Sequence, residues 1–198
     1  MNGHPPGGHG IYTAGVRARH KRDYYCEDPW VWPAFFRDVR LPAGVYDPFC
    51  GIGRVLDAAR WAGYREVFGS DIVRRAGLDR AHSFYRCSYQ DRIENPFGFL
   101  AHSVVSNPAY SWVDDLLVDV CAIRRPAALF LPITYLAGKA ELLARTPLQR
   151  VLVCKPRPSC PPPAASKRTG GKMDYAIFYF VPGTEPGTAR LGWLRRDP

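Results

Sequence analysis

The chain has 198 residues, which suits one domain or one domain with a small appendage, and its 46% hydrophobic content supports a sizeable core. Its formal net charge of +9 favours an acidic partner, most commonly nucleic acid, although some small basic proteins bind none. No apolar run approaches the roughly 18 residues that a membrane span needs, so no membrane partner is expected.

The six cysteines are scattered along the chain without a Cys-x-x-Cys pair, and most stand among apolar residues. This pattern predicts small core residues in a reducing compartment. Neither the cysteines nor the five histidines have the spacing of zinc ligands, so no metal site is predicted. The first ten residues lack the apolar segment of a signal peptide, and we therefore expect a cytoplasmic protein.

Residues 1–22 are predicted to form a flexible basic tail, and residues 23–198 a single domain. The first ten residues are too rich in glycine and proline to fold alone. Residues 17–22 are a basic run that suits either contact with a phosphate backbone or simple solvation. The aromatic segment that follows predicts a short helix packed on a sheet, with Trp32 and Phe35 buried.

The stretch at residues 45–54, Val-Tyr-Asp-Pro-Phe-Cys-Gly-Ile-Gly-Arg, predicts a strand, a tight glycine turn and the start of a helix. These elements form the first half of a βαβ unit, which places a small ligand at the carboxyl end of the strand. Gly51 and Gly53 would let the backbone approach that ligand because they have no Cβ. A dinucleotide fingerprint needs a third glycine where Leu56 stands, and Asp47 suits a cationic amine better than a pyrophosphate.

Residues 66–72 predict a strand that ends in an acid, Asp71, 18 residues beyond Gly53. In Rossmann-type folds an acid about 20 residues after the glycines accepts hydrogen bonds from ribose hydroxyls. Asp71 is therefore a candidate ligand for an adenosine group, and an ordinary exposed acid at a strand end is the alternative.

Residues 102–110 predict a strand that ends at Ser106 and presents Asn-Pro-Ala-Tyr at its carboxyl end. An exocyclic amine is a weak nucleophile because its lone pair is delocalised into the ring. The side-chain carbonyl of Asn107 and the backbone carbonyl of Pro108 could accept both amine hydrogens and so aim the lone pair at an electrophile. Tyr110 would offer a face on which a flat substrate stacks.

The remaining pattern predicts further helices and strands in alternation, which gives a three-layer α/β domain with a mostly parallel sheet. The expected helices cover residues 55–63, 74–85, 114–122 and 135–144, and the expected strands residues 85–88, 127–133, 150–154 and 175–181. Residues 191–196 are expected either to add an edge strand or to dock on the sheet.

The loop at residues 155–172 is long for a compact domain, rich in proline and cationic. It is predicted to be a substrate-side lid or phosphate clamp, and a solvated linker is the alternative. Its candidate nucleic-acid ligands are Arg157, Lys167, Arg168 and Lys172.

The motifs Asp-Pro-Phe-Cys-Gly-x-Gly and Asn-Pro-x-Tyr resemble those of S-adenosylmethionine-dependent amino-methyltransferases, closest to small phage-type DNA adenine-N6 methyltransferases. The resemblance covers roughly residues 23–181 and implies a three-layer Rossmann-like fold, with an antiparallel last strand near residues 175–181. The family's second motif is Asn-Pro-Pro-Tyr. Ala109 replaces its second proline here, at a position that shapes the loop and does not donate.

The resemblance implies S-adenosyl-L-methionine as the cofactor. Asp47 would meet its methionine amine, Asp71 its ribose, and Asp91 its adenine amine, while Gly51 and Gly53 pass beside it. A Tyr-x-Thr-Pro segment that precedes the first motif in one class of these enzymes is similar to residues 25–29, with an aspartate in place of threonine. The full set of implied cofactor ligands is Tyr25, Asp28, Asp47, Pro48, Phe49, Cys50, Gly51, Gly53, Asp71, Ile72, Asp91 and Asn107.

The implied function is methyl transfer to an exocyclic amine, adenine N6 in DNA first, with Asn107, Pro108 and Tyr110 around a flipped base. RNA and protein glutamine are alternative acceptors, because Asn-Pro-Pro-Tyr serves those nitrogens too. A non-catalytic cofactor-binding or nucleic-acid-binding protein is the alternative from another class. Little chain remains beyond the motifs for reading a DNA sequence, so we expect low sequence specificity or a partner that supplies it.

Overall fold

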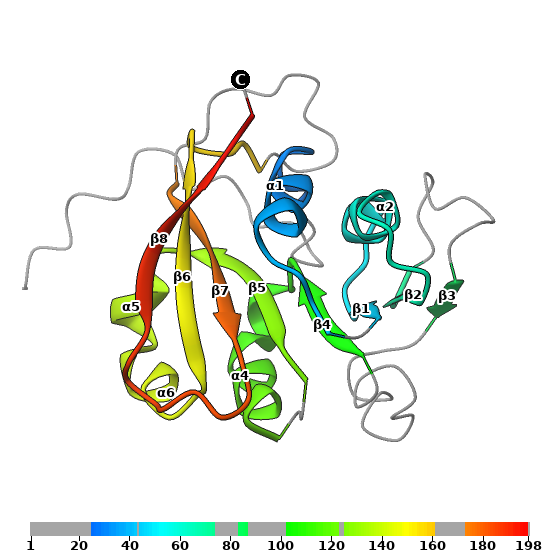
Figure 1. Cartoon of the computed structure of the whole chain (residues 1–198). Coiled ribbons are helices and arrows are strands. Elements are labelled where there is room, and N and C mark those ends of the chain that lie inside the picture. Colours follow the sequence, from blue (N-terminus) through cyan, green and yellow to red (C-terminus); the bar gives the residue numbers. More distant parts are fainter. Residues whose placement is uncertain are drawn as a thin grey trace, which may run out of the picture.

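The computed structural model describes residues 25–42, 44–73, 102–122, 125–160 and 173–197, and the backbone of residues 83–86 (Figure 1). At its centre lies an eight-stranded sheet in the order β3-β2-β1-β4-β5-β7-β6-β8. Strand β7 is antiparallel to both of its neighbours, and all other neighbouring strands run parallel.

The elements follow one another in the alternation that the sequence predicts. The strands are β1 Val45–Asp47, β2 Val67–Asp71, β3 Ser83–Arg86, β4 Ser103–Ser106, β5 Ala127–Pro132, β6 Leu148–Lys155, β7 Tyr175–Phe180 and β8 Arg190–Arg195. The helices are α1 Val31–Asp38, α2 Arg54–Trp61, α4 Val113–Ala122, α5 Tyr135–Gly138 and α6 Ala140–Leu143, with a 3-10 turn at Tyr110–Trp112.

Helices cover both faces of the sheet and so make three layers (Figure 1). On one face α1 and α2 pack over a core that includes Phe35, Phe130 and Ile177. On the other face α4 and α6 pack over a second core that includes Leu116 and Phe178. Strands β5 and β7 send alternate side chains to the two cores, and all six residues of β5 are buried, as expected for a central strand.

The aromatic segment forms α1 as predicted, and the side chains of Trp32 and Phe35 are buried. The helix tolerates Pro33 because that residue stands in the first turn, where a backbone N–H has no partner within the helix. Helix α2 ends just before Gly63, whose φ of 92° is the left-handed conformation that favours glycine at a helix end.

Two predicted helices and the place of one strand need correction. Residues 83–85 lie in β3, where they pair with β2, and not in a helix. The helix expected over residues 135–144 is two short helices, because the chain leaves helical geometry at Lys139, directly after Gly138, a poor helix former. Strand β7 is antiparallel as expected, but it is not the last strand, since β8 follows and forms the edge beside β6.

The strand order reverses between β1 and β4, which lie side by side although β2 and β3 come between them along the chain. In open α/β sheets, ligands bind in the crevice outside the carboxyl ends of the strands at such a point. The topology therefore predicts a ligand site beside the residues that follow Asp47 and Ser106.

No helix within the described residues is long and apolar enough to cross a membrane.

Candidate active site at the carboxyl ends of β1 and β4

The glycine turn after β1 has the backbone geometry that the motif predicts. Gly51 has φ 54° and Gly53 has φ 87°, both in the left-handed region. The Gly51 N–H donates to Asp71 Oδ2 at 3.0 Å, and the Val73 N–H donates to Asp71 Oδ1 at 3.0 Å. Asp71 thus fastens the turn to the end of β2.

The turn also depends on a third glycine, Gly69 in β2, which was not predicted from the sequence. A Cβ at this position would lie 2.7 Å from Leu56 Cδ1 and 2.8 Å from Cys50 Cβ. The Cys50 N–H also donates to the Ser70 carbonyl at 3.0 Å. The turn can lie this close to β2 because residue 69 has no side chain.

Asp47 stands at the end of β1 with its side chain buried. Its Oδ1 accepts from the Ser106 hydroxyl at 2.7 Å and from the Phe49 N–H at 3.0 Å, which joins the ends of β1 and β4. Burial raises the pKa of Asp47 to about 8, and the negative charges of Glu27 and Asp71 contribute to the rise, while the two hydrogen bonds oppose it.

Asn107 follows β4 and is held by two hydrogen bonds from its amide nitrogen. Nδ2 donates to the Tyr25 carbonyl at 2.9 Å and to Glu27 Oε2 at 2.7 Å. Because these bonds occupy the two amide hydrogens, they fix the plane of the side chain and leave Oδ1 as its acceptor.

Glu27 is a further site residue, and the sequence did not predict it. Its side chain is buried, and Trp32 Nε1 donates to its Oε1 at 2.7 Å. Burial raises the pKa of Glu27, while the hydrogen bonds from Asn107 and Trp32 and the charge of Arg54 lower it. No local pattern identifies this role, because Asn107 stands 80 residues away in the sequence.

Four tyrosines gather beside Asn107. The rings of Tyr25 and Tyr110 are nearly parallel, with centroids 6.4 Å apart, and Tyr135 meets Tyr110 edge-on at 6.1 Å. The Tyr110 and Tyr175 hydroxyl oxygens are 3.3 Å apart, and burial raises the pKa of Tyr110. Tyr25 thus lies against the ring on which a substrate was expected to stack.

The other predicted cofactor residues occupy the same edge or its immediate surroundings. Pro48 and Cys50 are buried and Phe49 is half-buried in the glycine turn, while Ile72, directly after Asp71, is 46% exposed. Asp28 Oδ2 accepts from the Ser159 N–H at 2.6 Å, so it ties the aromatic segment to the chain beyond β6.

Of the four predicted nucleic-acid ligands, Arg157 lies within the described residues. Its guanidinium forms a bidentate ion pair with Asp174, with Nε and Nη2 at 2.7 and 3.0 Å from the two carboxylate oxygens. Lys167, Arg168 and Lys172 lie outside the described residues, as do the predicted adenine ligand Asp91 and the tail at residues 1–22.

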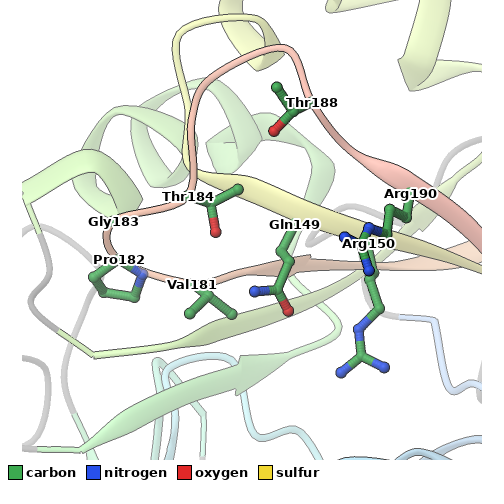
Figure 2. A pocket seen from close by; sticks show the side chains of 8 residues that line it. All are labelled: Gln149, Arg150, Val181, Pro182, Gly183, Thr184, Thr188 and Arg190. Carbon is green, nitrogen blue, oxygen red and sulfur yellow. The ribbon is translucent and has the colours of Figure 1, made fainter.

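A cavity of about 600 Å³ lies at the opposite edge of the sheet, where β6 and β8 begin and β7 ends (Figure 2). No predicted site residue lines it. Its wall is polar and cationic, and is formed by Gln149, Arg150, Val181, Pro182, Gly183, Thr184, Thr188 and Arg190. This cavity is therefore remote from the convergent acids and amide.

No protein-family model matches the sequence, and neither does any curated protein. Solved structures resemble its fold. A predicted O-methyltransferase from Agrobacterium tumefaciens has a TM-score of 0.54 at 14% identity, over 85% of this chain and 86% of its own. A modification subunit of a putative type I restriction enzyme from Vibrio vulnificus has a TM-score of 0.52 at 14% identity, over 82% of this chain and 45% of its own. TrmN from Thermus thermophilus has a TM-score of 0.52 at 20% identity, over 77% of this chain and 48% of its own.

At these identities the likeness shows the fold: the chain has the Rossmann-like α/β fold of methyltransferases, which confirms the predicted fold class. The chain spans less than half the length of the restriction subunit and of TrmN.

Proposed function

We propose that the chain is an S-adenosylmethionine-dependent methyltransferase that acts on the exocyclic amine of a nucleic-acid base, with adenine N6 in DNA as the first candidate. The observation that carries the proposal is the meeting of the two motifs at one place. Asp47 ends β1 and Asn107 follows β4 at the reversal point of the sheet, and Ser106, the residue before Asn107, donates to Asp47.

The residues present fit this cofactor. Asp47, Glu27 and Asp71 form a buried acidic group, and the pKa of Asp47 is raised to about 8, so a cation beside them would be stabilised. Such cations are the ammonium and sulfonium of S-adenosylmethionine. Arg54 Nε, directly after Gly53, is buried and has no hydrogen-bond partner in the described part of the chain, which suits a carboxylate.

Asp47 would bind the ammonium, Gly51 and Gly53 would allow close approach of the backbone, and Asp71 would accept from the ribose. Exposed Ile72 suits the apolar face of an adenine ring. When bound, the cofactor would supply a methyl group attached to a positively charged sulfur. The sulfur–methyl bond would break as the bond between the substrate nitrogen and the methyl group forms.

Asn107 Oδ1 and the Pro108 carbonyl would accept the two hydrogens of the substrate amine and direct its lone pair at the methyl group. Glu27 and the Tyr25 carbonyl would keep the Asn107 amide plane in this orientation. Alignment of this kind can supply effective molarities of about 10⁵–10⁸ M. Transfer moves the positive charge from the sulfur to the substrate nitrogen, and the methylated amine then releases one hydrogen to water as a proton.

A flat base would stack on the face of Tyr110 that Tyr25 covers, once the Tyr25 ring moves aside. The Tyr25 backbone carbonyl can stay bonded to Asn107 while its ring moves, because the ring turns about side-chain bonds. A base inside a duplex cannot reach this edge, so the substrate base must be flipped out or lie in a single strand.

The acceptor is proposed to be nucleic acid because the chain carries a net charge of +9. The structural neighbours include a restriction-enzyme modification subunit, which favours DNA, and RNA or protein glutamine is the second candidate. The proposal includes low sequence specificity, or a partner that supplies specificity. It also includes Asp28 and Asp91 among the residues that bind the cofactor.

Transfer of radiolabelled methyl from S-adenosylmethionine to separate pools of DNA, RNA and protein tests the proposal, with Asn107→Ala beside the wild type. We expect label in DNA as N6-methyladenine, and a loss of at least about 100-fold in the variant, because Asn107 aligns the amine. Label in RNA or protein would change the acceptor and keep the chemistry. No label in any pool would contradict the proposal.

A further inference from the structure

The ends of β6 and β8 place cations at the same edge of the sheet as Asn107. Both strands run parallel to β4 and β5, so their carboxyl ends share that edge (Figure 1). Lys155 and Arg195 are register partners, and the Arg196 N–H donates to the Lys155 carbonyl at 3.0 Å. All three side chains are exposed, and no acid among the described residues forms an ion pair with them.

An aromatic side chain stands beside these cations. Trp193 is 53% exposed and Leu191 is 61% exposed, whereas Leu194 is fully buried in the core under α1. Because side chains alternate along a strand, Leu191, Trp193 and Arg195 share the face of β8 that points away from α1. An exposed tryptophan next to an arginine is the pairing that stacks on unpaired bases and holds their phosphates.

The distance between the ends of β4 and β8 suits a single strand of nucleic acid that contacts both. Four strand spacings separate β4 from β8 in the sheet order, and at about 4.8 Å each they span about 19 Å. A few nucleotides of a single strand can cross this distance from a base held at Asn107.

We propose that Lys155, Trp193 and Arg195, here called the β8 surface, bind single-stranded nucleic acid beside the target base, with a neighbouring base stacked on Trp193. The inference rests on the proposed function and names the part of the substrate that this surface holds. A duplex suits Trp193 less well, because its bases are already stacked on one another.

A second copy of the chain is a weaker occupant of this surface. An edge strand can pair with another edge strand, but two copies of β8 would bring Arg190 and Arg195 of each close to those of the other. Like charges placed opposite one another disfavour strand pairing. A polyanion is attracted by the same residues.

Fluorescence anisotropy with labelled single-stranded DNA, single-stranded RNA and duplex DNA tests the base-stacking part. Trp193→Ala should weaken binding of a single strand about fivefold or more. The matched control is Trp61→Ala, which removes a tryptophan that is 79% exposed on α2, and it should leave the affinity unchanged within about twofold. The DNA and RNA arms show which strand the surface prefers.

Salt dependence tests the phosphate part. Arg195→Gln should reduce the slope of log K against log salt by about 0.7, the value for one phosphate contact on a single strand. Arg65→Gln, which removes an exposed arginine just before β2, should leave the slope unchanged.

The outcomes separate this inference from the proposed function. Equal affinities of Trp193→Ala and Trp61→Ala, or no binding of nucleic acid by the wild type, would overturn the β8 surface even if methyl transfer occurs. A change in sedimentation from dimer to monomer in Trp193→Ala would also overturn it, in favour of self-association. Weaker binding by Trp193→Ala in a protein that transfers no methyl would support the surface and contradict the proposed chemistry.

Discussion

The two edges of the sheet differ in what their loops contain. At the carboxyl edge, the segment before α1 and the ends of β1, β2 and β4 bring Glu27, Asp47, Asp71 and Asn107 into one hydrogen-bonded, mostly buried group. At the amino edge, the loop between β7 and β8 and the start of β6 surround a cavity of about 600 Å³ with a cationic wall. The buried acids and the fixed amide, and not the cavity at the amino edge, therefore mark the candidate site in this fold.

Replacement of Glu27 tests whether its hydrogen bond holds the Asn107 amide in place, and it should lower the rate of methyl transfer more than a substitution at the amino edge. In Glu27→Gln one of the two inward donors, Asn107 Nδ2 or Trp32 Nε1, loses its acceptor and faces an NH₂ group. The Asn107 plane should then turn, and we expect the rate of methyl transfer to fall about 10- to 100-fold in single-turnover assays.

Trp32→Phe is the control for that experiment, because it removes the other donor to Glu27 and leaves the Asn107 bond in place. It should lower stability more than it lowers the transfer rate. A Glu27→Gln enzyme that is as active as the wild type would show that Asn107 does not need this support.

Replacement of Gly69 tests how the glycine turn is held against β2. Gly69→Ala would place a Cβ 2.7 Å from Leu56 and 2.8 Å from Cys50, so overpacking should cost about 1–3 kcal/mol of unfolding free energy in denaturant titration. Gly138→Ala, where no atom lies within 4 Å of the new Cβ, should be neutral or slightly stabilising. Equal stabilities of the two variants would show that the turn and β2 are less tightly packed than the structure has them.

A substitution in the cavity at the amino edge should change activity least. Gln149→Ala removes a polar side chain from the wall of the cavity (Figure 2) and should leave both the transfer rate and the affinity for S-adenosylmethionine within about twofold of the wild type. A loss of activity comparable to that of Glu27→Gln would mean that the cavity takes part in the reaction.

The sequence predicts the strand–turn–helix unit well because its signals are local. The glycines at 51 and 53 and the apolar strand before them lie within a few residues of one another, and Asp71 ends the next strand along the chain. The partnership of Glu27 with Asn107 could not be predicted in this way, since it joins residues 80 positions apart whose contact depends on how α1 docks on the sheet.

The errors have physical reasons of the same kind. The requirement for glycine at position 69 arises from the packing of Leu56 and Cys50 against β2. Residues 83–85 pair with β2, and this sheet contact overrides their helical pattern. The ion pair of Arg157 with Asp174 could not be foreseen either, because it depends on how the chain after β6 returns to β7.

Calorimetric titration of S-adenosylmethionine between pH 6 and 8, into the wild type and Asp47→Asn, tests whether Asp47 binds the ammonium of the cofactor. The pKa of Asp47 is raised to about 8 in the free protein, so the carboxyl must lose a proton before it can bind the ammonium. Wild-type affinity should therefore rise with pH, by at most about tenfold per unit, whereas Asp47→Asn should bind more weakly at pH 8 and with little pH dependence. Equal affinities of the two proteins, or no binding by the wild type, would contradict the assignment of the cofactor to the carboxyl ends of β1 and β4.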